Sequence, residues 1–225
     1  MKVVYAATRN LYPCMGPTIK SLFAHNDPER VYIMAEDDDI GIPLPDVCQV
    51  VNVSGQKWIT NKTGRFTWMA SLRCCYPEIF PGEDKLLQLD IDTIVCDSLQ
   101  PLWETDLTGK WFGAVREWLG HYHPYGTSQY YNIGVALFNL AQMRKDNILP
   151  KLLDIVNNQR MLCQEQDALN CYAVPMGKVV DIPVRYNVSF CCGDAADPAI
   201  VHYAGVGDWF TSRTMKHREY LDGWR

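Results

Sequence analysis

The sequence predicts an α/β fold in which helices flank a mixed, mostly parallel sheet. Short apolar and β-branched runs alternate with longer amphipathic runs, and this alternation is most regular in the first half of the chain. The 225 residues are 48% hydrophobic and 21% charged, which is the composition of a globular protein with a sizeable core. We therefore expect a single domain over residues 1–225, in which a regular parallel half precedes a less regular half.

The N-terminal half predicts four strands and two helices. The strands are rich in β-branched or apolar residues and cover Lys2–Ala7, Val31–Ala35, Gln49–Val53 and Lys85–Asp90. The first helix begins near Pro17 and ends before Pro28, because proline lacks the N–H group that would continue it. The second helix covers Phe66–Phe80 and stops at Pro81. This order of elements is typical of β–α–β units, which build a parallel sheet.

The C-terminal half predicts shorter and less regular elements. Apolar segments with strand character cover Trp111–Val115, Ile133–Phe138, Val179–Ile182, Tyr186–Phe190 and Ile200–Tyr203. Helices are expected over Leu140–Asn158 and Gln164–Ala173. Pro150 should break or kink the first of these two helices.

The pattern of charged and apolar residues excludes several classes of partner. The chain has 21 basic and 26 acidic residues, a net charge of −5, and no block of Lys and Arg that would bind the phosphates of a nucleic acid. The apolar run at the N-terminus is too short for a signal peptide, and no apolar run approaches about 18 residues. We therefore expect no nucleic-acid partner, no membrane-spanning segment and a cytoplasmic location.

The cysteines predict free thiols. There are nine, an odd number, and no CxxC motif that would indicate a zinc ribbon or a thioredoxin-like site. Two pairs are adjacent in the sequence, Cys74-Cys75 and Cys191-Cys192. We expect the cysteines to be reduced and to pack as small apolar side chains.

The strongest local feature is an apolar strand that ends in Asp90-Ile91-Asp92, a DxD motif. Carboxylates at the carboxyl end of a strand lie in the crevice where open α/β sheets bind ligands. Two anionic oxygen donors suit a hard divalent cation, which would also relieve their mutual repulsion. Taken by itself, the motif is weak evidence for a metal site and favours a solvated turn.

Other segments accompany this motif in a fixed order. They are Lys2–Thr8 with Asn10 and Tyr12, Arg73 seventeen residues before Asp90, Asp97-Ser98-Leu99, Tyr131–Leu140, Gln164–Asn170 and His202–Gly205. Together with the DxD motif they resemble glycosyltransferase family 8, whose members are retaining nucleotide-sugar transferases. The resemblance implies a Rossmann-like GT-A fold and covers nearly the whole chain.

The resemblance also implies a metal site and a nucleotide site. The metal ligands would be Asp90, Asp92 and His202. A mixture of carboxylate and imidazole favours Mn²⁺, with Mg²⁺ as the alternative, because Mg²⁺ prefers oxygen ligands and water. The residues that correspond to the nucleotide-binding segments are Ala6, Ala7, Thr8, Asn10, Tyr12, Ile91 and Gly205.

The expected reaction transfers a hexose from a nucleoside diphosphate sugar, UDP-hexose in the first instance, to a carbohydrate or glycoconjugate acceptor. The resemblance places Arg73, Asn132, Glu165 and Gln166 around the donor hexose, with Gln166 closest to the β-face of the anomeric carbon. An amide is a poor nucleophile, so we favour front-face attack with Gln166 as electrostatic support over a covalent intermediate. Aromatic residues over 121–125, with Tyr130 and Tyr131, fit either an acceptor-binding loop or a packed loop.

Three positions depart from the family pattern. Thr8 replaces an aspartate that would bind the base, and Glu165 replaces an aspartate. Asp208 stands where the family has a lysine that touches the diphosphate, so either the metal acts alone or Arg213, Lys216 or Arg218 supplies the charge. These departures keep open a catalytically silent protein that binds sugar nucleotides and metal. A haloacid-dehalogenase-like phosphatase is a further alternative, because the DxD motif superficially resembles its nucleophile motif.

Overall fold

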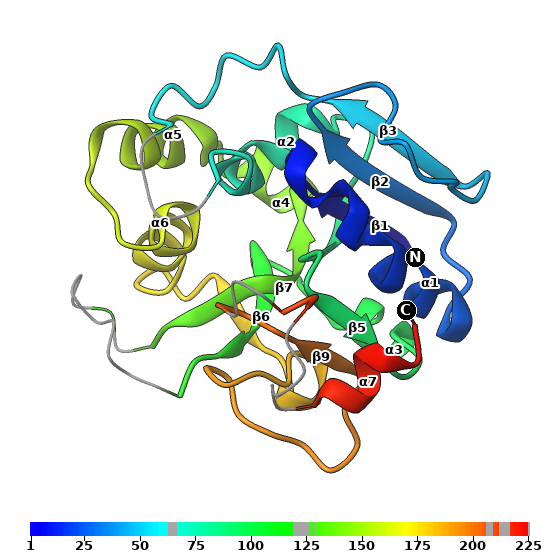
Figure 1. Ribbon diagram of the computed structural model, residues 1–225. Coiled ribbons are helices and arrows are strands. Elements are labelled where there is room, and N and C mark those ends of the chain that lie inside the picture. The colour runs from blue at the N-terminus through cyan, green and yellow to red at the C-terminus, as the bar shows by residue number, and fades with distance from the viewer. Residues whose placement is uncertain (63–66, 119–126, 128, 206–208, 212–216, 225) are drawn as a thin grey trace.

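The protein forms a mixed sheet in which most strands are parallel (Figure 1). The computed structural model describes residues 1–62, 67–118, 127, 129–205, 209–211 and 217–224. Over these ranges the sheet has seven strands in the order β3-β2-β1-β4-β7-β6-β8. Strand β7 is antiparallel to both of its neighbours, and every other pair is parallel. The predicted fold class is therefore confirmed.

The strands lie close to their predicted positions. The sheet contains β1 (Lys2–Ala6), β2 (Arg30–Ala35), β3 (Cys48–Asn52), β4 (Lys85–Leu89), β6 (Phe112–Arg116), β7 (Tyr131–Asn139) and β8 (Val179–Asp181). A second, two-stranded sheet pairs β5 (Thr93–Val95) antiparallel to β9 (Ile200–His202). The sequence analysis did not find β5. Its pairing with β9 places His202 opposite Thr93, directly after the DxD motif.

Helices cover the sheet on both faces (Figure 1). The α-helices are α1 (Met15–His25), α2 (Tyr76–Ile79), α3 (Gln100–Trp103), α4 (Leu140–Lys145), α5 (Leu149–Asn158), α6 (Gln164–Ala173) and α7 (Arg218–Asp222). The 3₁₀ helices are η1 (Arg9–Cys14), η2 (Ala70–Cys75) and η3 (Val184–Tyr186). In the described part of the chain, none of the helices has the length and apolar character that crossing a bilayer requires.

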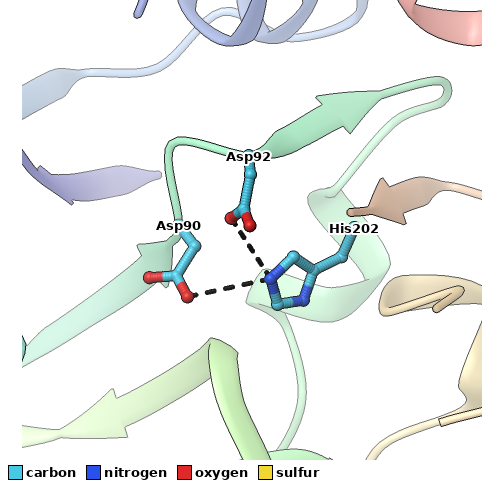
Figure 2. A group of neighbouring side chains, drawn as sticks. All are labelled: Asp90, Asp92 and His202. Atoms are coloured by element: carbon cyan, nitrogen blue, oxygen red, sulfur yellow. Dashed lines mark ion pairs between the residues drawn. The ribbon is translucent and has the colours of Figure 1, made fainter. Parts of the chain in front are cut away.

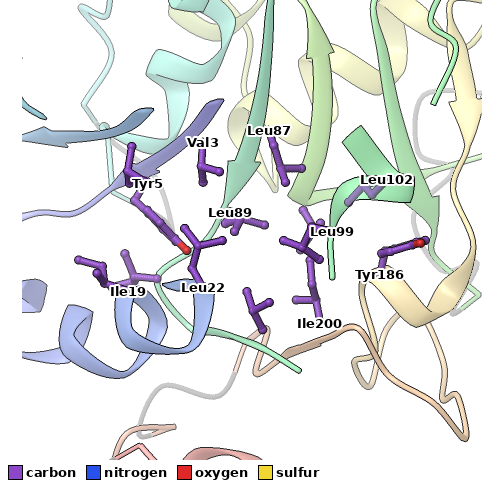
Figure 3. Close-up of a cluster of buried hydrophobic side chains, with 14 of the residues drawn as sticks. Val3, Tyr5, Ile19, Leu22, Leu87, Leu89, Leu99, Leu102, Tyr186 and Ile200 are labelled. Carbon is purple, nitrogen blue, oxygen red and sulfur yellow. The ribbon is translucent and has the colours of Figure 1, made fainter. Parts of the chain in front are cut away.

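The two faces of the sheet bury separate apolar clusters because side chains alternate along a strand. On β1, Val3 and Tyr5 join one cluster with α1 and α3, as Figure 3 shows. Val4, between them, joins the other cluster with η2, α5 and α6. Strand β4 alternates in the same way, with Leu87 in the first cluster and Leu86 in the second. Strand β4 is thus covered on both faces, and the chain leaves it at the DxD motif.

The break predicted at Pro150 is confirmed. Helix α4 ends at Lys145, and α5 restarts at Leu149 with Pro150 in its first turn. A proline is tolerated there because its missing N–H would have no partner within the helix.

The single helix predicted over Phe66–Phe80 is wrong. Phe66 lies outside the described residues, and the rest of the segment forms η2 followed by the short helix α2. Pro77 has no N–H group to bond to the carbonyl of Arg73, as an α-helix would require. That carbonyl instead accepts from Tyr76 N–H, one residue closer, which is the 3₁₀ pattern.

The strand predicted over Tyr186–Phe190 is also wrong. Val188 forms only an isolated bridge to Val201, and Ser189 bridges back to Gly193. Ser189 N lies 3.1 Å from Gly193 O, and Gly193 N lies 2.9 Å from Ser189 O. The chain therefore turns at this point, helped by the φ of 110° at Gly193, which a residue with a side chain rarely adopts.

Replacing Asn139 by Ala should destabilise the fold by about 1–2 kcal/mol. Its Oδ1 accepts from Gln142 N (3.0 Å) and caps α4, while its Nδ2 donates to Leu107 O (2.9 Å). Urea unfolding measures the change. Asn158→Ala is the matched control, since Asn158 contacts the exposed Asp154 at the surface. Equal losses in the two variants would contradict the capping role.

Candidate functional site

Three ionisable side chains, two from the DxD turn and one from β9, meet at one point (Figure 2). Asp90 follows β4, Asp92 precedes β5, and His202 ends β9. Nε2 of His202 lies 3.7 Å from Oδ2 of Asp90 and 3.3 Å from Oδ1 of Asp92. One ligand atom from each residue lies within 4.8 Å of the others. This is the arrangement of donors that a single metal ion needs.

Backbone hydrogen bonds fix the three positions. Asp90 N donates to Gly134 O on β7 (2.7 Å), which holds the start of the turn. Tyr203 N donates to Asp92 O (2.9 Å) and extends the β5–β9 pairing past His202. His202 lies 110 residues after Asp92 in the sequence. It reaches the carboxylates because β9 pairs with β5 so that His202 lies opposite Thr93.

Asn187 orients the imidazole, and the sequence analysis did not identify this role. It is fully buried, and its Oδ1 lies 2.8 Å from Nδ1 of His202. Since Asn187 uses its Nδ2 group to donate to Asn132 Oδ1 (2.9 Å), the oxygen is left to accept from the imidazole. Metal-binding histidines commonly donate their second ring N–H in this way, which aims the other nitrogen at the metal. No local sequence pattern indicates such a partner.

The charges at this point favour a cation. Burial alone would lower the pKa of His202, but Asp92 and then Asp90 outweigh burial and raise its pKa to about 9. The two carboxylates thus hold a proton on the imidazole at neutral pH. A divalent cation that took the place of this proton would satisfy the same two carboxylates.

Gly134 provides the space for this cluster. A Cβ atom added to it would overlap Cε1 of His202, and would lie 2.7 Å from Asp90 Oδ2 and 3.0 Å from His202 Nε2. Any side chain would therefore displace two of the three donors. Two carboxylates, an oriented imidazole and a glycine-lined cradle together fit a divalent metal ion.

A buried cation and carboxylate lie beside the cluster. Arg73 forms ion pairs with Asp90 and, through Nη1 at 3.0 Å, with Glu165 Oε1. The other oxygen of Glu165 is buried and has no hydrogen-bond partner among the described residues. Burial raises the pKa of Glu165 to about 7. Buried oxygens without a partner are rare in folded proteins, so Glu165 carries an unsatisfied acceptor beside the cluster.

The backbone at the start of α6 is strained beside this pair. Gln164 has a φ of 39°, which is uncommon for a residue with a side chain. Strained conformations of this kind cluster at ligand-binding sites, where the surrounding structure maintains them.

Asn132 and Gln166, the remaining predicted catalytic residues, both donate to the carboxylate of Glu117, which was not predicted from the sequence. Glu117, directly after β6, accepts from Asn132 Nδ2 (3.0 Å) and from Gln166 Nε2 (3.1 Å) on the same oxygen. Gln166 Oε1 in turn accepts from Ile133 N (3.0 Å). These bonds fix both amides relative to β7. Glu117 could not be found in advance, because it belongs to no motif and its partners follow only later in the chain.

The predicted nucleotide-binding residues lie at the same edge of the sheet. Ala6 ends β1, which runs parallel to β4, and the chain continues from it into η1. Ala7, Tyr12 and Ile91 are buried in one apolar cluster. Thr8 Oγ1 donates to Asn10 Oδ1 (2.8 Å).

Two further residues border this edge. The hydroxyl of Tyr12 donates to Asp37 Oδ2 (3.1 Å), a carboxylate after β2 that the sequence analysis did not select. Gly205 follows β9 with a φ of 72°, which suits a residue without a side chain.

Other sequence-based candidates divide between described and undescribed residues. Asp208, Arg213, Lys216 and the aromatic run 121–125 lie outside the described residues. Arg218 is buried, and its Nε donates to Asp222 Oδ1 (2.7 Å). Tyr130 and Tyr131 are buried, and their hydroxyls donate to Asp167 and Asp181 respectively. For these two tyrosines the structure favours the packed interpretation over an exposed acceptor loop.

The chain matches the sequence profile of one known protein family. The sequence profile of Glycosyl transferase family 8 matches residues 47–208, which include the DxD motif, His202 and all four predicted catalytic residues. The chain belongs to glycosyltransferase family 8. The predicted family is confirmed, and with it a glycosyltransferase fold of the GT-A type.

Relatives in this family occur in bacteria and in plants. Glycosyltransferase GlyE of Streptococcus pneumoniae is 28% identical over 73% of this chain and 42% of its own length. Glycosyltransferase GlyF of the same organism is 27% identical over 96% of this chain and 59% of its own length. The chain spans between 31% and 59% of the length of the first four curated relatives.

Solved structures agree on the fold. The galactosyltransferase LgtC, solved in complex with donor and acceptor sugar analogues, superimposes with a TM-score of 0.80 at 24% identity, covering all of this chain and 95% of LgtC. GlyE superimposes with a TM-score of 0.69 over 99% of this chain and 62% of its own.

Replacing Gly134 by Ala should abolish binding of a divalent cation, because the added methyl group overlaps His202 and Asp90. Titration calorimetry with Mn²⁺ measures the loss, and circular dichroism verifies the fold. Gly82→Ala is the matched control, since nothing lies within 4 Å of a Cβ at that position. Parental Mn²⁺ affinity in the Gly134 variant would contradict the assignment of the cradle.

Replacing Glu165 by Gln should stabilise the protein at high pH. The folded protein holds the proton of Glu165 up to about pH 7, whereas an ordinary glutamate releases it near 4.5, so stability is lost as the pH rises through this interval. The glutamine variant cannot ionise and keeps that stability. The advantage of the variant in free energy of unfolding should grow by up to about 3 kcal/mol between pH values near 5 and near 8. An advantage independent of pH would contradict the burial cost.

Proposed function

We propose that residues 1–225 form one GT-A catalytic domain of a retaining hexosyltransferase. It would move a hexose from a nucleoside diphosphate sugar, UDP-hexose in the first instance, to a carbohydrate or glycoconjugate acceptor. The observation that carries this proposal is the position of Asp90, Asp92 and His202 directly beside the Arg73–Glu165 ion pair. One group suits a metal diphosphate and the other a sugar, and membership of the family supports both.

Asp90, Asp92 and His202 would hold the metal ion, with Mn²⁺ favoured because one ligand is an imidazole. When bound, such an ion would neutralise the charge that develops on the diphosphate leaving group. Arg73 pairs with Oδ1 of Asp90 and so fixes this carboxylate with its other oxygen, Oδ2, at the metal position. Asn187 and Gly134 keep the imidazole aimed at the same point.

Arg73 and Glu165 would bind the hydroxyl groups of the donor hexose. Glu165 Oε1 is occupied by Arg73, while its buried Oε2 has no partner among the described residues and would accept from a sugar hydroxyl. A hydrogen bond to that oxygen would compensate for the cost of burying the carboxylate. The replacement of aspartate by Glu165 is consistent with this role, because the longer side chain still reaches Arg73.

Gln166 would support the reaction without bonding to the sugar. Its amide oxygen holds Ile133 N and its amide nitrogen holds Glu117 and the hydroxyl of Tyr130 (3.1 Å). A group engaged on both atoms acts as a fixed dipole, and an amide is a weak nucleophile in any case. We therefore favour front-face attack, in which the protein positions the acceptor and the leaving group on one face of the hexose.

The nucleotide would lie along the edge formed by Ala6, Ala7 and η1. Thr8, Asn10 and Tyr12 offer polar atoms there, while Ile91 and Gly205 would line the diphosphate side. Asp37 is a further carboxylate at this edge, held by Arg9 at 2.7 Å. Its proximity supports a base-binding role for this region, although Thr8 replaces the usual aspartate.

We also propose a class of donor sugar and a location for the protein. The galactosyl activity in the name of LgtC supports a hexose, and glucose, galactose and galacturonate all remain compatible with the residues here. All nine cysteines are free thiols, which is consistent with the predicted reducing cytoplasm.

Two alternatives to this transferase function are a phosphatase and a silent binding protein. Family membership favours transfer over the phosphatase alternative. A silent protein that binds sugar nucleotides and metal is kept as the second candidate, because Glu165 departs from the family pattern inside the site itself.

A panel of UDP-sugars incubated with the protein and Mn²⁺ tests the proposal through release of UDP. We expect release from at least one hexose donor, and its loss when a chelator removes the metal. Asp92→Asn and His202→Ala should each lower turnover by at least about 100-fold, the scale of removing a metal ligand or its support. Asp106→Asn is the control, since Asp106 is exposed and its neighbour Thr105 contacts Lys85 at the opposite end of β4.

The outcomes separate the candidates. Mn²⁺-dependent binding of UDP without turnover of any donor would establish the silent binding protein. Full turnover in both metal-site variants would overturn the proposed metal ligands.

A further inference from the structure

A pair of adjacent cysteines lies next to the proposed donor site. Cys191 and Cys192 occupy the turn that Ser189 and Gly193 close with two backbone hydrogen bonds. Their Sγ atoms lie 3.9 Å apart, and the two residues are 5% and 7% exposed. The thiols therefore face each other in a largely buried position.

Polar groups surround Cys191. Its Sγ lies 3.3 Å from Ser189 Oγ and 3.7 Å from Asn132 Nδ2. The hydrogen bonds with Cys192 and then with Ser189 lower the pKa of Cys191 against the opposing effects of burial and of the Glu117 carboxylate, while the pKa of Cys192 rises. A thiolate beside a thiol is the arrangement in which oxidation of one sulfur is followed by attack of the other.

The other adjacent pair provides an internal contrast. Cys74 and Cys75 are fully buried on η2. Burial raises both pKa values, that of Cys75 to about 12, so neither thiol ionises near neutral pH. Adjacency in the sequence is therefore not sufficient, and the polar turn distinguishes Cys191 and Cys192.

We propose that Cys191 and Cys192 are a modification site, a dithiol that a hydroperoxide converts into a disulfide. The thiolate of Cys191 attacks the peroxide oxygen, which forms a sulfenic acid and releases water or an alcohol. The sulfur of Cys192 then attacks the sulfenic sulfur, an S–S bond forms, and water leaves. Both sulfurs are oxidised and the peroxide is reduced, with two thiol hydrogens lost overall.

The disulfide would disturb the site through Asn132. This residue bonds to Cys191 Sγ with its amide nitrogen and to Asn187 with its amide oxygen, and Asn187 orients His202. Adjacent Cα atoms are about 3.8 Å apart, below the range of about 4.4–6.8 Å found in disulfides, so closing the bond must shift the turn. Such a bond is also easily reduced, which makes the modification reversible.

The test treats reduced, metal-free protein with hydrogen peroxide and maps the thiols by alkylation and peptide mass spectrometry. We expect a disulfide between Cys191 and Cys192 that dithiothreitol removes, and no such product in Cys191→Ser or Cys192→Ser. Cys48→Ser, on the edge strand β3, is the control and should oxidise like the parent. If both thiols of the pair stay open to alkylation, or react only to irreversible acids, the proposal is overturned.

A second measurement tests the link to the donor site, which rests on the proposed function. The affinity for UDP with Mn²⁺ should fall about fivefold on oxidation, the effect of losing one average hydrogen bond, and recover on reduction. The double variant Cys191→Ser/Cys192→Ser should be insensitive to peroxide. Unchanged affinity in the oxidised parent would overturn the link. Absence of UDP binding in the reduced parent would instead count against the proposed function, while the mapped disulfide still decides the modification.

Discussion

The rest of the site depends on the convergence of two carboxylates and one imidazole in a space that only a glycine leaves open. Asp90 and Asp92 come from the turn between β4 and β5 and His202 from β9, and a side chain at Gly134 would overlap His202 and Asp90. The neighbouring strands position these residues. Strand β7 carries Gly134, and the pairing of β9 with β5 places His202 beside the carboxylates. Two carboxylates this close together need a nearby positive charge. They raise the pKa of His202, so the imidazole keeps its proton when no metal is present.

A second layer of side chains holds this cluster in place. Arg73 connects Asp90 to Glu165, and Asn187 connects His202 to Asn132. Burying so many polar groups is favourable only when each has a partner. The open oxygen of Glu165 breaks that rule, so the site stores a cost that a bound hydroxyl would relieve. Stability given up at a binding site in this way is a recurrent feature of proteins.

The same network explains how the proposed modification at Cys191 and Cys192 would affect the metal position. Cys191 contacts Asn132, Asn132 contacts Asn187, and Asn187 contacts His202. Coupling of this kind needs a continuous physical path and an element that can take two arrangements. The turn over Ser189–Gly193 supplies the second requirement, because its sulfurs can be bonded or free.

The sequence by itself determined the alternation of strands and helices, the break at Pro150 and the family, since each of these is written in local patterns or in motifs of fixed spacing. It also indicated the DxD motif and the histidine as candidates. The tertiary structure decided the rest. Pro77 converted one predicted helix into two pieces through a single missing hydrogen bond, and the turn at Gly193 replaced a strand. Glu117 and Asn187 acquire their roles only from partners at least fifteen residues away in the chain. Such contacts depend on strand register, which no local pattern specifies, because pairing partners are chosen by the packing of the whole fold.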